Sequence, residues 1–292
     1  MLKFKKIELD DFKFYKKWTE NNREFSCENS FINLLVWQEL YNNMMAVDEG
    51  QIFIKSGTEG NEKFKLPLGG DLKEGIEKIF EYCGKQPDFW VQEGELCDEF
   101  KRLYGENYNF KVYRDAADYI YSREDLATLK GKKYHSKRNH INSFSKKYDW
   151  HYETINNGNV DKVMLCADEW YRENSDRLDG NMLCEKNGIE LVLGNMEALE
   201  ARGGAIFIED KAVAFTIGSM INPSVFDIHF EKALKDYSEA YTVINNEFAK
   251  NALSEFEFIN REDDLGLEGL RKAKLSYNPC KILEKYTCKA GE

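Results

Sequence analysis

The chain has 292 residues, 42% of them hydrophobic and 14% aromatic, which is enough apolar material for one large or two ordinary folded domains. Its 41 basic and 52 acidic residues leave a formal net charge of −11, which disfavours indiscriminate binding to nucleic acid because phosphates are repelled. The longest candidate membrane segment, from Phe31 to Trp37, is far below the ~20 residues of a spanning helix. We therefore expect a folded protein without transmembrane segments.

The seven cysteines are widely scattered and never form a Cys-x-x-Cys pair, so the sequence predicts neither a disulfide framework nor a zinc ribbon. The amino terminus runs directly into acidic residues, without an apolar stretch of signal-peptide length. These features are typical of a cytoplasmic protein with reduced thiols.

Hydrophobic periodicity predicts the elements of the first half of the chain. Two helices come first, then two short strands joined by a polar hairpin loop, then alternating helices and strands. The predicted segments are helices over 8–22 and 29–43, strands over 45–55 and 63–68, a helix over 71–83, a strand over 88–92, a helix over 95–104 and a long strand from 109 to about 121.

The second half follows a similar order, with one extra helix and one extra strand. The predicted segments are helices over 132–147, 160–173 and 188–201, strands over 204–210, 212–220 and 225–231, a helix from about 238 to 253, a strand over 256–260, a helix over 267–276 and a last strand over 280–288.

Helices, a β-meander and then a β-α-β-α-β run are the element order of a GCN5-related N-acyltransferase domain. Because this order occurs twice, we predict an α/β (α+β) chain with two tandem acyltransferase-like domains, each built on a mixed central sheet. The domains are predicted over residues 1–125 and 126–292, and the second is expected to carry the active cleft.

The predicted strand 225–231 carries the candidate catalytic residues. With a side-chain period of two, Asp227, His229 and Glu231 share one face, opposite the apolar residues. Acyl transfer to an amine or hydroxyl needs a base, which His229 or Glu231 could supply. A solvated strand face explains the same alternation. A metal site built from the three residues is disfavoured, so we predict no metal.

Polar residues follow the buried strand 256–260, at the strand end where α/β sheets open a ligand crevice. Arg261 offers a bidentate fork for a carboxylate or a phosphate. Acidic side chains beside it could hold a substrate ammonium group. The candidate substrate-binding residues of this segment are Asn260, Arg261, Glu262 and Asp263, with Asp264 as a further acid.

The helix 267–276 adds two basic candidates for substrate binding. Arg271 and Lys274 lie three positions apart, so they could contact one phosphate together. The alternative is an ordinary solvated face of a charged helix.

The segment 129–147 is strongly basic within an acidic chain. Seven Lys and Arg residues fall between Lys130 and Lys147, with no acid among them. On a helix, the aromatic and aliphatic residues of this segment form one core-facing stripe. The stripe consists of Tyr134, Ile141, Phe144 and Tyr148.

The basic residues of that helix form a candidate nucleic-acid interface. Lys133, Lys137 and His140 fall on a face beside the stripe, with Arg138 next to them, and none is needed for the core. Such a patch would let an acidic protein dock a polyanion locally. The alternative is a solvated basic helix.

Glycine is absent where an enzyme that uses coenzyme A would need it. Such enzymes cradle pyrophosphate with a Gly-rich loop at a helix amino terminus, but no glycine occurs between Gly218 and Gly266. Coenzyme A is therefore the less expected donor, and no cofactor is predicted.

Three segments together resemble the family of the phosphatidylglycerol lysyltransferase C-terminal domain, and SFINLLVW (30–37) resembles its amino-terminal part. The three are LKGKKYHSKRNHINSF (129–144), FDIHFEKA (226–233) and INREDDLGLEGLRKAKLSYNP (259–279). The resemblance implies a tandem acyltransferase fold of the kind that takes an aminoacyl group from transfer RNA. Its His-x-Glu-Lys pattern adds Lys232 to the substrate-binding residues. Full-length members carry a membrane flippase before this domain, and we expect no such segment within these 292 residues.

The leading hypothesis is a transferase that moves an aminoacyl group from transfer RNA to an amine or hydroxyl of a small molecule, lipid or peptide. One alternative is an N-acyltransferase that uses acyl-coenzyme A and a small amine. A second alternative is a binding module without catalytic activity, because a fold does not determine a function.

Overall fold

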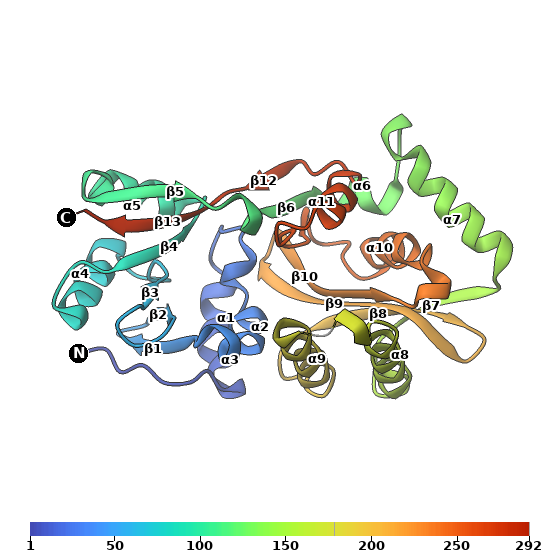
Figure 1. The fold of residues 1–292 in the computed structure, drawn as a ribbon, viewed down its shortest axis with the longest axis horizontal. Coiled ribbons are helices and arrows are strands. Elements are labelled where there is room, and N and C mark those ends of the chain that lie inside the picture. Colours follow the sequence, from blue (N-terminus) through green and yellow to red (C-terminus); the bar gives the residue numbers. More distant parts are fainter. Residues whose placement is uncertain (178, 292) are drawn as a thin grey trace.

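Two β-sheets form the frame of the molecule (Figure 1), and both contain parallel as well as antiparallel pairs. The computed structural model describes residues 1–177 and 179–291. The first sheet has the strand order β1-β2-β3-β4-β13-β5 and the second β12-β6-β11-β10-β9-β8-β7. The strands are β1 (Met44–Asp48), β2 (Gln51–Ser56), β3 (Lys63–Phe64), β4 (Asp88–Gln92), β5 (Tyr108–Val112), β6 (Asp118–Ser122), β7 (Trp150–Thr154), β8 (Arg202–Ile208), β9 (Lys211–Asn222), β10 (Val225–Ala233), β11 (Phe258–Asn260), β12 (Lys281–Leu283) and β13 (Lys285–Ala290).

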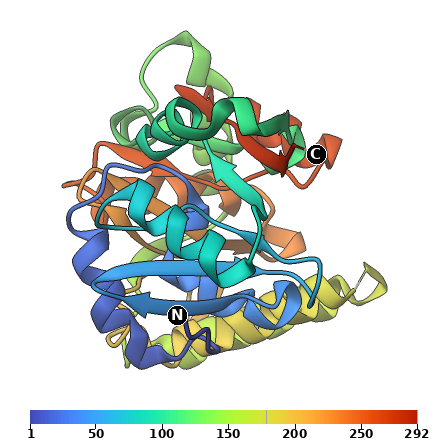
Figure 2. The same ribbon diagram turned by 90° about the vertical axis from the view of Figure 1, so that its left-hand side faces the viewer.

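Helices cover both faces of the second sheet, with α8 and α9 on one side and α7 and α10 on the other (Figure 1). Seen from the side, α4 lies in front of the first sheet (Figure 2). The helices are α1 (Phe12–Thr19), α2 (Phe31–Val36), α3 (Gln38–Tyr41), α4 (Leu72–Cys83), α5 (Glu95–Tyr104), α6 (Arg123–Thr128), α7 (His135–Lys147), α8 (Val160–Glu173), α9 (Gly180–Leu193), α10 (Ala240–Asn251) and α11 (Glu268–Leu275). Short 3-10 helices cover Leu9–Asp11, Cys27–Asn29, Gly105–Asn107, Arg114–Ala116, Lys132–Tyr134, Ser175–Arg177 and Lys235–Tyr237.

The chain crosses between the sheets twice. The predicted strand 109–121 is broken by the turn Arg114–Ala116, so that β5 belongs to the first sheet and β6 to the second. The predicted strand 280–288 is broken at Glu284, which sends β12 to the second sheet and β13 back to the first. A division at residue 125 therefore does not separate the two sheets, although two tandem mixed sheets are present as predicted.

The helix predicted over 188–201 is misplaced by about two turns, because α9 runs from Gly180 to Leu193. The Asp179 carboxylate fixes its start by accepting a hydrogen bond from the backbone N–H of Met182 at 2.9 Å. Ser122 caps the unpredicted α6 in the same way, accepting from the N–H of Asp125. The edge strand β7 was also missed.

A β-bulge interrupts the pairing of β10 with β9. Ile228 pairs with Gly218 and Phe230 with Ile217, so His229 has no partner residue on β9. The backbones approach closely here, because a Cβ built on Gly218 would lie 2.0 Å from the carbonyl oxygen of Asp227. The extra residue reverses the alternation of side chains beyond it.

β10 and β11 run parallel only over three residue pairs, ending at Asp227 and Asn260. β10 continues to Ala233, whereas the chain after Asn260 turns away. The two strands therefore separate at their carboxyl ends. That opening is the position at which α/β sheets commonly hold a ligand.

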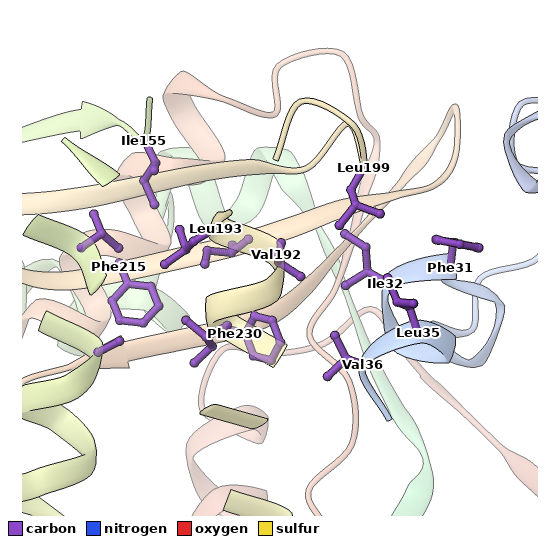
Figure 3. Packing of buried hydrophobic residues seen from close by; sticks show 14 of the residues in the cluster. Phe31, Ile32, Leu35, Val36, Ile155, Val192, Leu193, Leu199, Phe215 and Phe230 are labelled. Carbon is purple, nitrogen blue, oxygen red and sulfur yellow. The ribbon is translucent and has the colours of Figure 1, made fainter. Parts of the chain in front are cut away.

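One hydrophobic core joins the amino-terminal segment to the second sheet (Figure 3). Phe31, Ile32 and Leu35 of α2 are buried with residues of α8, α9, β9 and β10. Phe215 and Phe230 from the sheet belong to the same cluster. Each fully buried side chain of this size contributes about 1.5–3 kcal/mol relative to exposure. The cluster holds the start of α2 against β9 and β10.

No helix within residues 1–177 and 179–291 combines the length and the hydropathy that crossing a membrane requires.

The core-facing stripe predicted for the basic helix is confirmed, because Tyr134 and Phe144 are fully buried.

Candidate active site

His229 lies in the bulge of β10 with a fully buried side chain. Its Nε2 atom lies 2.8 Å from the Oγ of Ser219 on β9 and 3.3 Å from the Oγ of Ser30, the residue before α2. Its Nδ1 atom lies 3.3 Å from Glu262 Oε1 and 3.4 Å from Asp227 Oδ2. The imidazole thus joins two hydroxyl groups on one side to two carboxylates on the other.

The two carboxylates beside His229 are held close together. The side-chain N–H of Asn33 donates to Glu262 Oε1 at 2.8 Å. Burial, with Glu262 and Asp118 nearby, raises the pKa of Asp227 well above its usual range. Among the described residues, Asp227 Oδ1 has no hydrogen-bond partner. The pair is therefore suited to take up a proton or to bind a cation.

Asp227, His229 and Glu262 are also a combination that could hold a divalent metal ion. One ligand atom from each lies within 4.8 Å of the others. Carboxylate and imidazole ligands suit several such ions. The absence of a metal site therefore stays a prediction.

A buried ion pair between Lys285 and Asp118 is linked by hydrogen bonds to residues beside this cluster. Lys285 Nζ lies 2.8 Å from Asp118 Oδ1 and 3.3 Å from Cys27 Sγ. Asp118 Oδ2 accepts hydrogen bonds from the Cys27 N–H at 2.9 Å and from Asn260 Nδ2 at 3.0 Å. Burial disfavours the charge on Lys285, but Asp118 and Glu28 outweigh it and raise its pKa. Burial raises the pKa of Cys27, so its thiol stays protonated.

Asn260 also orients Glu262. Its Oδ1 accepts a hydrogen bond from the Glu262 N–H at 2.7 Å, and Glu262 takes a left-handed backbone conformation with φ of +56°. Asn260 pairs with Asp227 across the two strands. This turn directs the Glu262 side chain towards His229. The structure thus brings together candidate residues from two of the predicted segments.

Glu231 does not share the face of Asp227 and His229, contrary to the prediction. Its carboxylate bonds Arg261 Nη2 at 2.7 Å and Asn245 of α10 at 3.2 Å, so it lies on the α10 side of the sheet. The bulge at His229 is the cause, because it shifts the alternation by one residue. Glu231 is therefore the partner of a buried guanidinium, and His229 remains the candidate base.

Lys232 points to the side of α8 and α9. Its Nζ donates to Glu185 Oε1 at 2.7 Å and lies 4.2 Å from the centre of the Trp170 ring. These contacts hold the charge away from the His229 cluster. The substrate-binding role predicted for Lys232 stays a prediction.

Arg271 and Lys274 point in different directions, and the role predicted for them at one phosphate stays a prediction. Arg271 binds Asp264 Oδ2 at 2.8 Å and Asp115 Oδ1 at 2.7 Å. The hydrogen bond from Arg271 holds the pKa of Asp264 well below its usual range. Lys274 is directed the other way and donates to the carbonyl of Arg261. Burial, together with Arg261, lowers the pKa of Lys274.

Asp263 is partly buried and belongs to the same charged region. Burial raises its pKa to about 6, and Lys285 opposes this effect. The nearby negative charges of Asp118 and Glu262 raise this pKa further. Asp263 is thus an acid whose charge changes near neutral pH.

Unpaired polar atoms occur on both faces of the sheet near the end of β10. Five buried side-chain atoms of the described residues lack a hydrogen-bond partner. Three of them, Thr216 Oγ1, Asn245 Oδ1 and Arg261 Nη1, belong to residues next to Glu231 on the α10 side. Asp227 Oδ1 lies on the other face, beside His229. Buried polar groups are normally paired, so each of these atoms is available to water or to a ligand.

A pocket of about 990 Å³ opens beside Ser219. Its walls come from α1, from the segment 193–202 after α9, and from the ends of β9 and β10. Ser219 and Phe31 are among the lining residues, together with Lys16 and Arg202 near the rim. Ser219, whose hydroxyl contacts His229, therefore belongs to the lining of this pocket, whereas His229, Asp227 and Glu262 do not.

A second, smaller groove of about 360 Å³ lies between α7 and α11. It is lined by Lys133, Lys137 and His140 from the basic helix and by Lys272 from α11. Arg138 faces away from it and donates to the carbonyls of Leu129 and Gly131. Three of the four predicted nucleic-acid-binding residues therefore share one surface, whose function is untested.

Lys137 is buried, contrary to the expectation that no basic residue of this helix is needed for the core. Its Nζ donates to Ser276 Oγ at 2.7 Å and lies 3.5 Å from the centre of the Tyr277 ring. Burial lowers its pKa to about 8, assisted by the nearby charge of Arg261. Lys137 ties α7 to the end of α11.

Several residues of the site were not predicted from the sequence. Ser30 and Asn33 lie within or beside the SFINLLVW segment, which was used for resemblance and not for chemistry. Ser219, Asp118 and Lys285 carry no local motif. Only the folded chain brings them together, because they come from separate strands.

Residues 20–289 match the family described as "Phosphatidylglycerol lysyltransferase, C-terminal", which confirms the resemblance. A conserved protein of unknown function from Bacteroides thetaiotaomicron is 38% identical, with 100% of both chains covered and a TM-score of 0.91. An uncharacterised protein of Mycoplasmoides gallisepticum is 23% identical over 184 residues. That match spans 61% of this chain and 58% of the relative, so it covers little more than half of that protein's length.

Two solved structures share the fold at low identity. The C-terminal domain (DUF2156) of a proposed lysylphosphatidylglycerol synthetase from Agrobacterium fabrum has 12% identity and a TM-score of 0.64, with 97% of this chain and 92% of that chain covered. L-PGS from Bacillus licheniformis has 14% identity and a TM-score of 0.58, with 93% and 94% covered. The tandem acyltransferase-like fold predicted from the element order is confirmed.

Proposed function

The chain belongs to the family of the phosphatidylglycerol lysyltransferase C-terminal domain, and we propose that it transfers an aminoacyl group from transfer RNA to an amine or hydroxyl acceptor. The observation that carries this proposal is the buried His229 between two hydroxyls and two carboxylates. A base is the group that acyl transfer to such acceptors requires. Lysyltransferase activity is named for relatives of this chain and supports the same reaction class.

The charge around His229 suits a cationic acyl group. Five carboxylates gather here against three ammonium groups, an excess of two acids. The acids are Glu28, Asp118, Asp227, Glu262 and Asp263, and the ammonium groups are Lys65, Lys274 and Lys285. In a buried region this excess favours an added cation. We propose that the α-ammonium of the aminoacyl group supplies it, with Glu262 and Asp263 as its partners.

Transfer RNA is the donor that we propose, with the groove between α7 and α11 as a phosphate contact. Lys133 and Lys272 lie on opposite walls of this groove, and each phosphate contact would add salt-dependent attraction. Acyl-coenzyme A is the less favoured donor. The connection from β10 to α10 contains no glycine and carries Asp236 and Glu239, which would repel a pyrophosphate.

The reaction is tested by following radiolabelled aminoacyl groups on a mixture of charged transfer RNAs, with small amines, peptides and phosphatidylglycerol vesicles as acceptors. We expect the wild type to move label to one acceptor class. His229→Gln should reduce the rate at least about 100-fold, the usual range for loss of a general base. If the wild type moves no label to any acceptor, the proposal is wrong.

The donor is tested separately by binding of bulk transfer RNA across a salt series. We expect Lys133→Ala with Lys272→Ala to weaken binding and to flatten the salt dependence by up to about two phosphate contacts. A matched control is Lys13→Ala with Lys17→Ala, which removes the same charge from the exposed face of α1. Equal effects of the two pairs would show that only net charge matters. A rise in Tm with acetyl-coenzyme A, without RNA binding, would favour the other donor.

A further inference from the structure

We propose that Ser219 is a nucleophile that carries the acyl group as an ester on its Oγ before the acceptor receives it. This inference rests on the proposed acyl transfer and adds a covalent intermediate to it. It concerns a serine that no sequence motif marks, because the chain has no nucleophile elbow around this position.

The geometry is that of a serine, a histidine and an acid in series. Ser219 Oγ lies 2.8 Å from His229 Nε2, which is hydrogen-bond distance for proton transfer. His229 Nδ1 lies within 3.4 Å of both Asp227 and Glu262, either of which could accept its proton in a hydrogen bond. The same order of roles is found on unrelated folds, so it is recognised by geometry and not by chain position.

Ser219 and the neighbouring Ser30 differ in their position relative to the pocket. Ser219 lines the pocket of about 990 Å³, which is large enough for an aminoacyl group and part of its carrier. Ser30 is more deeply buried, does not line that pocket, and its Oγ lies farther from His229 Nε2, at 3.3 Å. Of the two serines, Ser219 combines the shorter contact to His229 with a position in the lining of the pocket.

The bulge of β10 gives this arrangement a fixed frame. It places His229 opposite no residue of β9, so that its ring can reach across to Ser219, the residue next to Gly218 at the edge of the bulge. Asp227, which pairs with Ser219 in the ladder, lies directly beside the ring. The three side chains are thus set by one pair of strands and need no moving loop.

The chemistry balances in two steps. In the first, Ser219 Oγ bonds to the carbonyl carbon of the aminoacyl ester, its proton passes to His229 Nε2, and the carbon–oxygen bond to the ribose breaks. The ribose oxygen takes that proton and leaves. In the second, the acceptor amine or hydroxyl attacks the seryl ester and gives its proton to His229, which returns a proton to Ser219 Oγ as the ester bond breaks.

A fluorophosphonate probe tests the nucleophile without any transfer RNA. Attack by an activated serine forms an oxygen–phosphorus bond and releases fluoride, which adds a fixed mass to the chain. We expect one label per chain on Ser219 by peptide mapping. Ser219→Ala should abolish it, and His229→Gln should slow it at least about 100-fold. The exposed Ser254→Ala, outside both the site and the groove, should still be labelled.

Two results would overturn the inference. One is a wild type that stays unlabelled, or a label that maps to Ser30 or elsewhere. The other is aminoacyl transfer by Ser219→Ala at the wild-type rate, which would mean direct transfer while leaving the proposed function intact. Circular dichroism and Tm confirm that each variant is folded. Should Ser219→Ala not fold, Ser219→Gly offers the same test with no added bulk.

Discussion

The Nζ atom of Lys285 lies 2.8 Å from the carboxylate of Asp118, and both side chains are fully buried. Asp118 begins β6 in the second sheet, and Lys285 begins β13 in the first. The two places where the chain crosses between sheets are therefore joined by one ion pair. Asp118 also accepts hydrogen bonds from the Cys27 N–H and from the Asn260 side chain. Asn260 in turn orients Glu262 beside His229.

We predict that Lys285→Met lowers the free energy of unfolding by about 3–5 kcal/mol, because it leaves Asp118 buried without its counter-charge. Adding Asp118→Asn should restore part of the loss. Urea unfolding measures both variants. The matched control is Lys281→Met, which breaks an exposed pair with Glu93 and should cost less than about 1 kcal/mol. Equal losses from Lys285→Met and Lys281→Met would contradict the structural role.

The bulge of β10 can be tested through a glycine. Gly218→Ala would place a Cβ 2.0 Å from the Asp227 carbonyl oxygen and 2.5 Å from the Phe226 ring, so the strands must move apart. We expect a loss of at least about 2 kcal/mol in unfolding free energy and slower aminoacyl transfer, since His229 shifts with the strand. Gly105→Ala meets no atom within 4 Å and should leave both quantities nearly unchanged.

Substitutions of Glu231 and Glu262 should affect stability and activity to different extents. Glu231→Gln leaves the buried Arg261 without its anionic partner, and we expect a loss of about 2–4 kcal/mol in unfolding free energy. Glu262 is more exposed and contacts His229, so Glu262→Gln should slow transfer at least about 10-fold while costing less stability. Thermal unfolding and single-turnover transfer measure the two effects. If Glu231→Gln is the slower variant with an unchanged Tm, the assignment of roles is reversed.

Periodicity predicted most of the fold, because α4 and α5 each bury one stripe of residues at helical spacing. Periodicity did not predict the two places where the chain crosses between the sheets. The break at Arg114–Ala116 contains neither glycine nor proline, and the break before Lys285 is a single residue. Such breaks are decided by the strands with which each segment pairs, since β6 lies between β12 and β11 and β13 between β4 and β5, and that is tertiary information.

For the candidate site, the structure brings together residues from two of the segments that the sequence singled out, and part of the predicted geometry is present. Asp227, His229 and Glu262 do meet. Glu231 was assigned to the wrong face because a bulge inserts one residue into the alternation and leaves no mark in the sequence. Ser30 and Ser219 were missed because small hydroxyl residues are common, and only a contact with His229 distinguishes them.

Lys137 makes stability depend on pH in a predictable direction. Its pKa is lowered to about 8 in the folded chain, chiefly by burial, whereas an unfolded lysine titrates near 10.5. Between these values the unfolded chain binds more protons than the folded one, so stability rises with pH, by at most about 1.4 kcal/mol per pH unit. Below pH 8 both states are protonated, and the cost of the buried charge is fully present.

We therefore predict that the free energy of unfolding of wild type, relative to Lys137→Met, rises as pH increases from 8 to 10. Urea titrations of both proteins at pH 7, 8, 9 and 10 measure this difference, in which other titrating groups cancel. Lys146→Met, an exposed change on the same helix, should give a curve parallel to wild type. Parallel curves for Lys137→Met as well would mean that solvent reaches this ammonium in the folded protein.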